Sequence, residues 1–390
     1  MTSRRLASVD MLRGLVMVIM TIDHTRDFVH SAAMNFRPED LAQTTPAIFL
    51  TRWITHICAP AFMLCAGLGA ALRLERGETV AGLSRFLWTR GLWLIVLELT
   101  VVHFGFFLSF DYRLVILLVF WALGACMIVL ALLVHLPYRV LLVLSIAVIL
   151  AHDLADGVRA ARFGALAGVW QLLHEQGLLW PKPAVIVAYP LVPWIFVMSL
   201  GLCLGGVYRL PAERRRLLLV RLGLAMTAAF VALRVLNVYG DPRPWRAQPK
   251  PFFTLLSFLD TSKYPPSLAF LLMTLGPALA LLGWLERFSP GERHPLLVFG
   301  RVPLFYFILH IPLAHVIERA LTWLRYGAVP FLFVPPPTIG TPREVFPADF
   351  GWSLGTVYLV TAAVVLALYP VCLWYARLKQ RRRDWWLSYL

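Results

Sequence analysis

Long apolar segments follow one another along almost the whole chain, and short polar stretches separate them. Each segment has close to 20 residues, which is enough for a helix to cross about 30 Å of hydrocarbon. Inside lipid every backbone N–H and C=O must find a partner within the protein. Continuous apolar runs therefore favour helices over a barrel of short alternating strands. The pattern predicts an all-α, polytopic integral membrane helix bundle.

Ten spanning helices are expected, and the chain shows neither an internal repeat nor a separate soluble domain. Residues 1–390 are therefore interpreted as one domain. The first segment holds Arg13, Asp23 and His24, which suits a retained helix better than a cleaved signal peptide. The expected ranges are 11–28, 46–72, 86–108, 114–134, 138–154, 184–208, 217–238, 266–285, 302–323 and 351–376.

Basic residues are distributed unevenly between the two sets of connections. With ten crossings, 20 of the 36 Lys and Arg residues, among them Arg4 and Arg5, fall on the side of the N-terminus, and 12 fall on the other side. Basic connections stay in the cytoplasm, so both termini are predicted to be cytoplasmic. The net charge of +15 is explained in this way, and no nucleic-acid module accompanies it. The five cysteines lie in apolar segments without a CxxC spacing, so we expect buried thiols and no metal site.

Two outer connections are long and rich in proline. Residues 240–251 and 325–350 cannot be helical throughout, because proline lacks the N–H that a helix interior needs. One interpretation is that these loops cover a cavity on the outer face, and the other is that they form irregular surface. The sequence leaves both open.

Ionisable side chains at membrane depth are the main functional signal, since each costs about 2.5–3.5 kcal/mol on insertion scales. With the expected topology most of them lie between the midplane and the outer face. The adjacent Asp23 and His24 are the strongest candidates for chemistry, whereas His56, His103 or His315 taken singly fits a structural hydrogen bond. The full set is Asp23, His24, Arg52, His56, Glu98, His103, Asp111, Arg234, His310, His315, Glu318 and Arg319.

Arginines at the inner ends of the first helices admit two interpretations. Asp10 and Arg13 stand three residues apart and can pair on one helix face as an anchor. Alternatively, Arg13 together with Arg73, Arg85 and Arg90 binds a cytoplasmic polyanion that carries phosphate groups. Arginines at this level are also expected for topology alone.

Several motifs, in order, resemble those of a known family. They are Ser8-Val9-Asp10-Met11-Leu12-Arg13-Gly14 with Asp23-His24, Cys58-Ala59-Pro60-Ala61-Phe62 with Gly67, Tyr189-Pro190-Leu191-Val192-Pro193-Trp194, Lys263-Tyr264-Pro265-Pro266-Ser267-Leu268, and Gly300-Arg301-Val302-Pro303-Leu304-Phe305-Tyr306 with His310. Together they resemble bacterial inner-membrane proteins related to heparan-α-glucosaminide N-acetyltransferase, within the wider transmembrane acyltransferases.

The resemblance implies a multi-pass enzyme of the bacterial inner membrane that takes an acyl group, expected to be acetyl, from cytoplasmic acetyl-CoA and transfers it to a sugar or glycolipid hydroxyl or amine outside. Our hypothesis for the mechanism has His24 as general base, Asp23 as its orienting partner, and Lys263, Tyr264 or His310 as the donor to the oxyanion. His56, Tyr189, Trp194, Lys263 and Tyr264 are expected to bind the acceptor, and Arg13, Arg73, Arg85, Arg90 and Arg301 to bind acetyl-CoA. No metal is expected.

A second residue is considered as the general base, and a second function is considered for the protein. In the animal lysosomal enzyme the place of His24 holds an Asn, and the catalytic His lies in the following loop, where this chain has Asn35 and the nearby His30. His24 resembles the first-helix His of the broader acyltransferase group and is preferred. Intramembrane Asp and His also serve proton-coupled transporters and flippases, which is the alternative function. Beyond membrane lipids and the acceptor, a homo-oligomer is compatible with the sequence.

Overall fold

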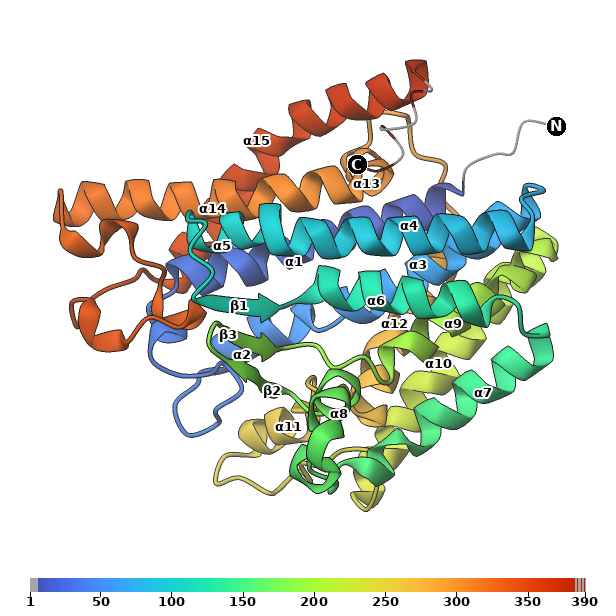
Figure 1. Ribbon diagram of the computed structural model, residues 1–390, viewed down its shortest axis with the longest axis horizontal. Helices are drawn as coiled ribbons and strands as arrows, with labels where there is room; N and C mark the ends of the chain where they lie inside the picture. Colours follow the sequence, from blue (N-terminus) through green and yellow to red (C-terminus); the bar gives the residue numbers. More distant parts are fainter. Residues whose placement is uncertain (1–5, 383, 385–386, 388, 390) are drawn as a thin grey trace.

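The computed structural model describes residues 6–382, 384, 387 and 389, and helices dominate it (Figure 1). The expected all-α bundle is thereby confirmed. Arg4, Arg5 and Arg383, which the sequence places on the inner side, lie outside the described residues. The helices are α1 Ala7–Val29, α2 Pro46–Thr55, α3 Cys58–Glu75, α4 Val80–Leu97, α5 His103–Phe107, α6 Val119–Leu133, α7 Tyr138–Ala151, α8 Ala167–Leu173, α9 Trp194–Leu204, α10 Ala212–Leu236, α11 Pro251–Leu259, α12 Leu268–Leu285, α13 Pro295–Arg301, α14 Pro303–Tyr326 and α15 Leu354–Arg381.

Seven helical segments of the described chain are long and apolar enough to cross a membrane, and the protein is an integral membrane protein. The apolar helices α6 and α9 are shorter, and α1 carries charges near both of its ends. Each of the ten expected ranges overlaps a helix, but ten crossings with both termini inside stay a prediction. The seven segments are Pro46–Glu75, Val80–Phe107, Tyr138–Ala155, Ala212–Leu236, Leu268–Leu285, Pro303–Tyr326 and Leu354–Arg381.

Two of the expected helices, 114–134 and 184–208, begin too early. Their first residues instead form strands β1 Leu114–Leu117 and β3 Ala184–Val187, which pair in parallel, while β2 Gly177–Pro181 pairs antiparallel with β3. The β-branched runs at these positions favour extended backbone. Prolines then delay α9, because Pro190 and Pro193 precede its first turn.

Breaks also interrupt two of the expected helices, and a third begins one residue late. The range 46–72 divides into α2 and α3 at His56 and Ile57, and the range 302–323 starts one residue late because Val302, before a proline, has φ −132° and ψ 48°. In the range 86–108 a π-helical turn, Glu98–Val102, joins α4 to α5. Such turns are frequent at functional sites because they alter the direction in which side chains point.

Helix α1 lies in the middle of the bundle, against α2, α3, α12, α13, α14 and α15. Its contact with α13 is made by backbone. A Cβ on Gly300 would stand 1.7 Å from the carbonyl oxygen of Asp10, and one on Gly14 would stand 1.9 Å from that of Leu296. Only glycine permits this approach, so the pair fixes α13 against the inner half of α1.

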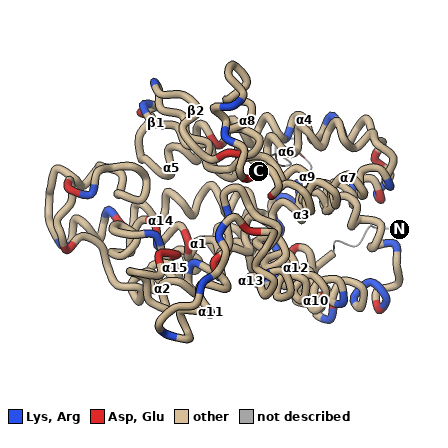
Figure 2. Tube along the Cα trace, turned by 90° about the horizontal axis from the view of Figure 1, so that it is seen from below, with Lys and Arg blue, Asp and Glu red and all other residues tan. Residues whose placement is uncertain are grey.

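Charged residues collect at helix ends and in a cluster near the labels of α1 and α2, and the helix bodies between them are mostly uncharged (Figure 2). All five cysteines are buried and free, as expected. Arg234 is buried rather than extended toward a membrane surface. Its guanidinium donates hydrogen bonds to the carbonyl oxygens of Ser257, Phe258, Asp260 and Arg243, and so fixes the connection between α10 and α12.

Candidate functional site

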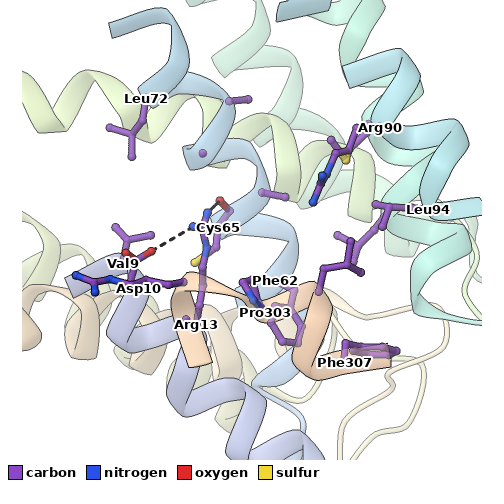
Figure 3. A pocket seen from close by; sticks show the side chains of 18 of the residues that line it. Val9, Asp10, Arg13, Phe62, Cys65, Leu72, Arg90, Leu94, Pro303 and Phe307 are labelled. Atoms are coloured by element: carbon purple, nitrogen blue, oxygen red, sulfur yellow. Dashed lines mark hydrogen bonds and ion pairs between the residues drawn. The ribbon is translucent and has the colours of Figure 1, made fainter. Parts of the chain in front are cut away.

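A cavity of about 410 Å³ opens beside the N-terminal half of α1 (Figure 3). It is called the inner cavity below, because the predicted topology puts this end of α1 in the cytoplasm. Its walls come from α1, α3, α4, α6, α13, α14 and the end of α15. Asp10 is the single acidic residue among the lining residues, so the cavity is strongly basic. The basic lining residues are Arg13, Arg73, Arg76, Arg90, Arg301 and Lys379.

Neighbouring groups hold several of these cations in place. Arg13 donates a 2.7 Å hydrogen bond to the carbonyl oxygen of Cys65 and lies 3.7 Å from the carboxylate of Asp10, an ion pair drawn in Figure 3. The Arg73 guanidinium bonds to Glu78 and stacks 3.8 Å above the ring of Phe86. Fixed guanidinium groups suit phosphate oxygens, because their N–H groups match them in pairs.

Four of the five arginines expected at an acetyl-CoA site line this one cavity: Arg13, Arg73, Arg90 and Arg301. Arg85, on the same helix as Arg90, is exposed and does not line it. Arg76 and Lys379 join the set, although the sequence gave no reason to choose them from the other basic residues near helix ends. Lys379 comes from the last helix, which only the tertiary structure brings to α1.

A smaller cavity of about 170 Å³, called the outer cavity below, lies beside the C-terminal half of α1. It gathers residues from α1, α2, the π-turn, α5, β1, α6 and α14, and from the loops before α9 and α12. Thr338 and Ile339 of the proline-rich loop 325–350 also line it, so this loop covers part of the cavity. The ionisable residues of the lining are Asp23, His24, Asp27, Arg52, Glu98, His103, Tyr189, Lys263 and Tyr264.

The imidazole of His24 is paired with that of His310. Nδ1 of His24 lies 2.7 Å from Nε2 of His310, and Nδ1 of His310 lies 3.3 Å from the carbonyl oxygen of Tyr306. A carbonyl only accepts, so we assign the proton of His310 to Nδ1, and its Nε2 then accepts from His24. The remaining nitrogen of His24, Nε2, keeps its lone pair and is the basic atom of the pair.

Asp23 has other partners. Its carboxylate lies 2.5 Å from Arg52 and 3.0 Å from Arg26, and no hydrogen bond joins it to His24 in the described part of the chain. Arg52 also donates a hydrogen bond to Glu39 in the connection between α1 and α2. Burial raises the pKa of the Glu39 carboxyl, but Arg52 and His56 outweigh it and hold that pKa far below its usual range. Asp23 thus secures Arg52 at the cavity, and the orienting contact of His24 is made by His310.

The residues expected to bind an acceptor divide into two groups. Tyr189, Lys263 and Tyr264 line the outer cavity, where the Tyr264 hydroxyl donates a 3.2 Å hydrogen bond to the Tyr189 hydroxyl. His56 and Trp194 do not line it. Both are buried, and both rings pack against Phe270. Their buried positions suit a structural role, in which they support the neighbouring loops.

The other imidazole considered as the base, His30, lies one residue beyond α1. It is buried beside the bridge that its backbone forms with Trp352, and it lines neither cavity. Burial and the nearby Arg26 lower the pKa of His30 to about 4. Asn35 accepts a hydrogen bond from Arg343 on the outer surface. Only His24 of these three residues reaches a cavity.

The two cavities share a wall. Phe307 of α14 and Val119 of α6 line both of them. The Phe307 ring lies 5.9 Å from the His24 ring and 4.2 Å from the Phe120 ring. Arg13 and His24 are eleven residues apart on α1, which corresponds to about 16 Å along the helix axis. Phe307 and Val119 therefore lie between the basic cavity and the cavity that contains His24.

Four ionisable lining residues of the outer cavity were not chosen as site residues from the sequence. Arg52, Glu98 and His103 had a signal, since each is ionisable at membrane depth, whereas Asp27 follows the first helix unremarkably. No group of three His, Cys, Asp or Glu side chains is arranged to hold a metal ion among the residues that the structure describes.

Comparison with known proteins adds one family. The model described as "Heparan-alpha-glucosaminide N-acetyltransferase, catalytic" matches residues 5–240, which is more than half of the chain. The matched part holds α1, the π-turn and Tyr189, and it ends before Lys263 and His310. No curated protein matches the chain.

Proposed function

The chain belongs to the heparan-alpha-glucosaminide N-acetyltransferase family, and from this membership and the two cavities we propose a transmembrane acyltransferase of the bacterial inner membrane. The donor is cytoplasmic acetyl-CoA, and the acceptor is a hydroxyl or amine of a sugar on the opposite side. The observation that carries the proposal is the wall of Phe307 and Val119, which is common to a basic cavity and to the cavity of His24.

The inner cavity suits the donor. Its volume of about 410 Å³ falls in the usual range of about 300–1,000 Å³ for small-molecule sites. Arg13, Arg73, Arg76, Arg90, Arg301 and Lys379 would contact the phosphates of acetyl-CoA at the mouth. The apolar inner lining, with Phe62, Leu94 and Phe307, would receive the arm that ends in the thioester.

The outer cavity suits the reaction. Nε2 of His24 takes the proton of the acceptor, while His310 keeps the ring in the required tautomer. The acceptor then attacks the thioester carbonyl, the C–S bond breaks, and the proton passes to the sulfur of CoA. Lys263 or Tyr264 donates to the oxyanion that forms on the carbonyl oxygen. The rings of Phe106 and Phe307 contact the His24 imidazole edge-on, with centroid distances of 5.7 and 5.9 Å.

Purified protein in liposomes, loaded inside with radiolabelled acetyl-CoA and supplied outside with sugar acceptors, tests the proposal. We expect label on the external acceptor with the wild type and its loss with His24→Ala. His135→Ala, which changes an exposed imidazole that lines neither cavity, should retain transfer. Movement of an acceptor across the membrane without consumption of acetyl-CoA would instead support a transporter.

A further inference from the structure

The loop that brings Lys263 and Tyr264 to the outer cavity is held from two sides. It comprises residues 262–267, and a 2.9 Å hydrogen bond from the N–H of Ser267 to the carbonyl oxygen of Ser262 closes it. Asp241, in the connection between α10 and α11, holds the first side. Its Oδ2 accepts hydrogen bonds from the Ser262 N–H, at 2.8 Å, and from the Ser267 hydroxyl, at 2.7 Å. One carboxylate thus fixes both ends of the 262–267 loop.

His152 and Asp153 hold the second side of the loop. They belong to the short turn that follows α7. Nε2 of His152 lies 2.8 Å from the carbonyl oxygen of Pro266, and Oδ2 of Asp153 accepts a 3.0 Å hydrogen bond from the N–H of Leu268. Leu268 is the first residue of α12, so this N–H has no partner within the helix. Neither His152 nor Asp153 lines a cavity, so any effect on the site passes through the loop.

Both nitrogens of the His152 ring face hydrogen-bond acceptors. Nδ1 lies 2.9 Å from the carbonyl oxygen of Ile149, and Nε2 faces that of Pro266. Because a carbonyl oxygen only accepts, each nitrogen carries a proton, and we assign the ring as an imidazolium. Oδ1 of Asp153 lies 2.9 Å from Nε2 and balances the charge. The two side chains form a buried ion pair.

A buried ion pair is a poor device for stability alone. Two charges must leave water to form it, and apolar side chains of similar volume are often more stable at such positions. What the pair supplies is direction, since one N–H and one carboxylate oxygen each fix a backbone group at hydrogen-bond distance. Direction matters at this loop, because a displacement of about 1 Å at a reacting site can lower a rate about 100-fold.

We infer that His152 and Asp153 are positioning residues for the acceptor side of the reaction, because they hold the 262–267 loop with Lys263 and Tyr264 at the outer cavity. This inference rests on the proposed acyltransferase. Loss of the pair lets the loop move, which weakens the contacts of Lys263 and Tyr264 with the acceptor and the oxyanion. Binding of acetyl-CoA in the inner cavity is left unchanged. Loss of either proton from the ring leaves a lone pair facing a carbonyl oxygen, so high pH releases the loop.

A second imidazole in the same cluster provides a matched control. His174, at the end of α8, lies 3.1 Å from the carboxylate of Asp156, and its ring centroid is 6.2 Å from that of His152. It is buried like His152, but no hydrogen bond of the described chain joins it to the 262–267 loop. The titratable side chains on the elements around His152 are Asp153 and Asp156 of its own turn, His174, Tyr239 and Asp241 of the connection after α10, and Lys263 and Tyr264 of the loop.

Kinetics of the purified protein in detergent, with glucosamine as the acceptor probe, test the inference. We expect His152→Ala to lower kcat/KM for the acceptor about 10- to 100-fold at pH 7, and to leave the Kd for CoA within twofold. His174→Ala should change neither by more than twofold. His152→Gln keeps an N–H for Pro266 without a charge, so it should recover most of the rate. Its rate relative to the wild type should rise between about pH 6 and pH 10, as the wild-type ring loses its proton.

Nitrogen NMR of protein that contains isotope-labelled histidine separates this inference from the acyltransferase itself. The His152 signals, assigned by their loss in His152→Gln, should show both ring nitrogens protonated at pH 7. A neutral ring would overturn the inference even if His152→Ala does not fold. Equal losses in His152→Ala and His174→Ala, or a constant ratio of His152→Gln to the wild type, would also overturn it while His24-dependent turnover remained. Absence of wild-type turnover, with the imidazolium still seen, would instead remove the acyltransferase and with it the role of the pair.

Discussion

Nδ1 of His24 lies 2.7 Å from Nε2 of His310, although 286 residues separate the two along the chain. Because Nδ1 of His310 faces the carbonyl of Tyr306, this contact directs the lone pair of His24 to Nε2. A helix near the C-terminus thereby sets the tautomer of a base on the first helix. The proposed chemistry depends on both ends of the chain.

Replacing His310 should slow transfer without weakening the binding of acetyl-CoA. His310→Ala removes the acceptor of the His24 Nδ1 proton, so the ring loses its fixed tautomer. We expect kcat to fall about 100-fold with an almost unchanged KM for acetyl-CoA. His310→Gln, which offers an oxygen to His24, should recover part of the rate. Equal rates for the alanine variant and the wild type would show that the pair has no role in transfer.

Arg90 and Arg85 form a matched pair on α4. Arg90 lines the inner cavity, and Arg85 is exposed away from it. Loss of one charge-assisted contact costs about 1.5–3 kcal/mol, so Arg90→Gln should raise the Kd for CoA at least about tenfold. Arg85→Gln should leave it unchanged. Calorimetric titration with CoA would measure both, and equal effects would count against the cavity as the CoA site.

Phe307 should control passage between the cavities, because its ring belongs to the wall that they share. Phe307→Ala opens that wall and admits water to the thioester. We expect hydrolysis of acetyl-CoA without acceptor to rise several-fold, while the yield of transferred acetyl falls. Phe305→Ala is the control on the same helix, since Phe305 stacks on Tyr375 and lines neither cavity. Hydrolysis that is unchanged in Phe307→Ala would place the barrier elsewhere.

Gly300→Ala should destabilise the bundle. The added Cβ would stand 1.7 Å from the carbonyl oxygen of Asp10, so α13 must move away from α1. Overpacking of this kind costs about 1–3 kcal/mol. We expect a lower midpoint of thermal unfolding in detergent. Gly291→Ala, where the Cβ meets no atom within 4 Å, should keep the wild-type midpoint.

Asp260, in the connection between α11 and α12, should make the stability of this part of the protein depend on pH. Burial raises the pKa of Asp260 to about 6, above its unfolded value of about 3.9. Between these values the folded state binds more protons than the unfolded state, so stability falls as pH rises and is constant above pH 6. Asp260→Asn removes this loss. The difference in thermal midpoint, variant minus wild type, should grow from near zero at pH 4 to a plateau above pH 6, and a difference independent of pH would contradict this.

The sequence by itself determined the class of fold and the residues at which chemistry was expected. Apolar runs of about 20 residues select membrane helices, because lipid offers no partner to an exposed backbone group. The cost of charge in lipid also marked Asp23, His24 and His310, as well as Arg52 and Glu98. These inferences need only local composition and one physical rule for each position.

The tertiary structure decided which of these residues meet. The pairing of His24 with His310 and the gathering of basic residues from α1, α3, α4, α13 and α15 result from helix packing, and no local pattern encodes those contacts. Packing also placed His56 and Trp194 outside the outer cavity and brought Asp23 into an ion pair with Arg52. The strands at 114–117 and 184–187 escaped prediction for the same reason, since apolar β-branched runs suit both elements until a partner strand is present.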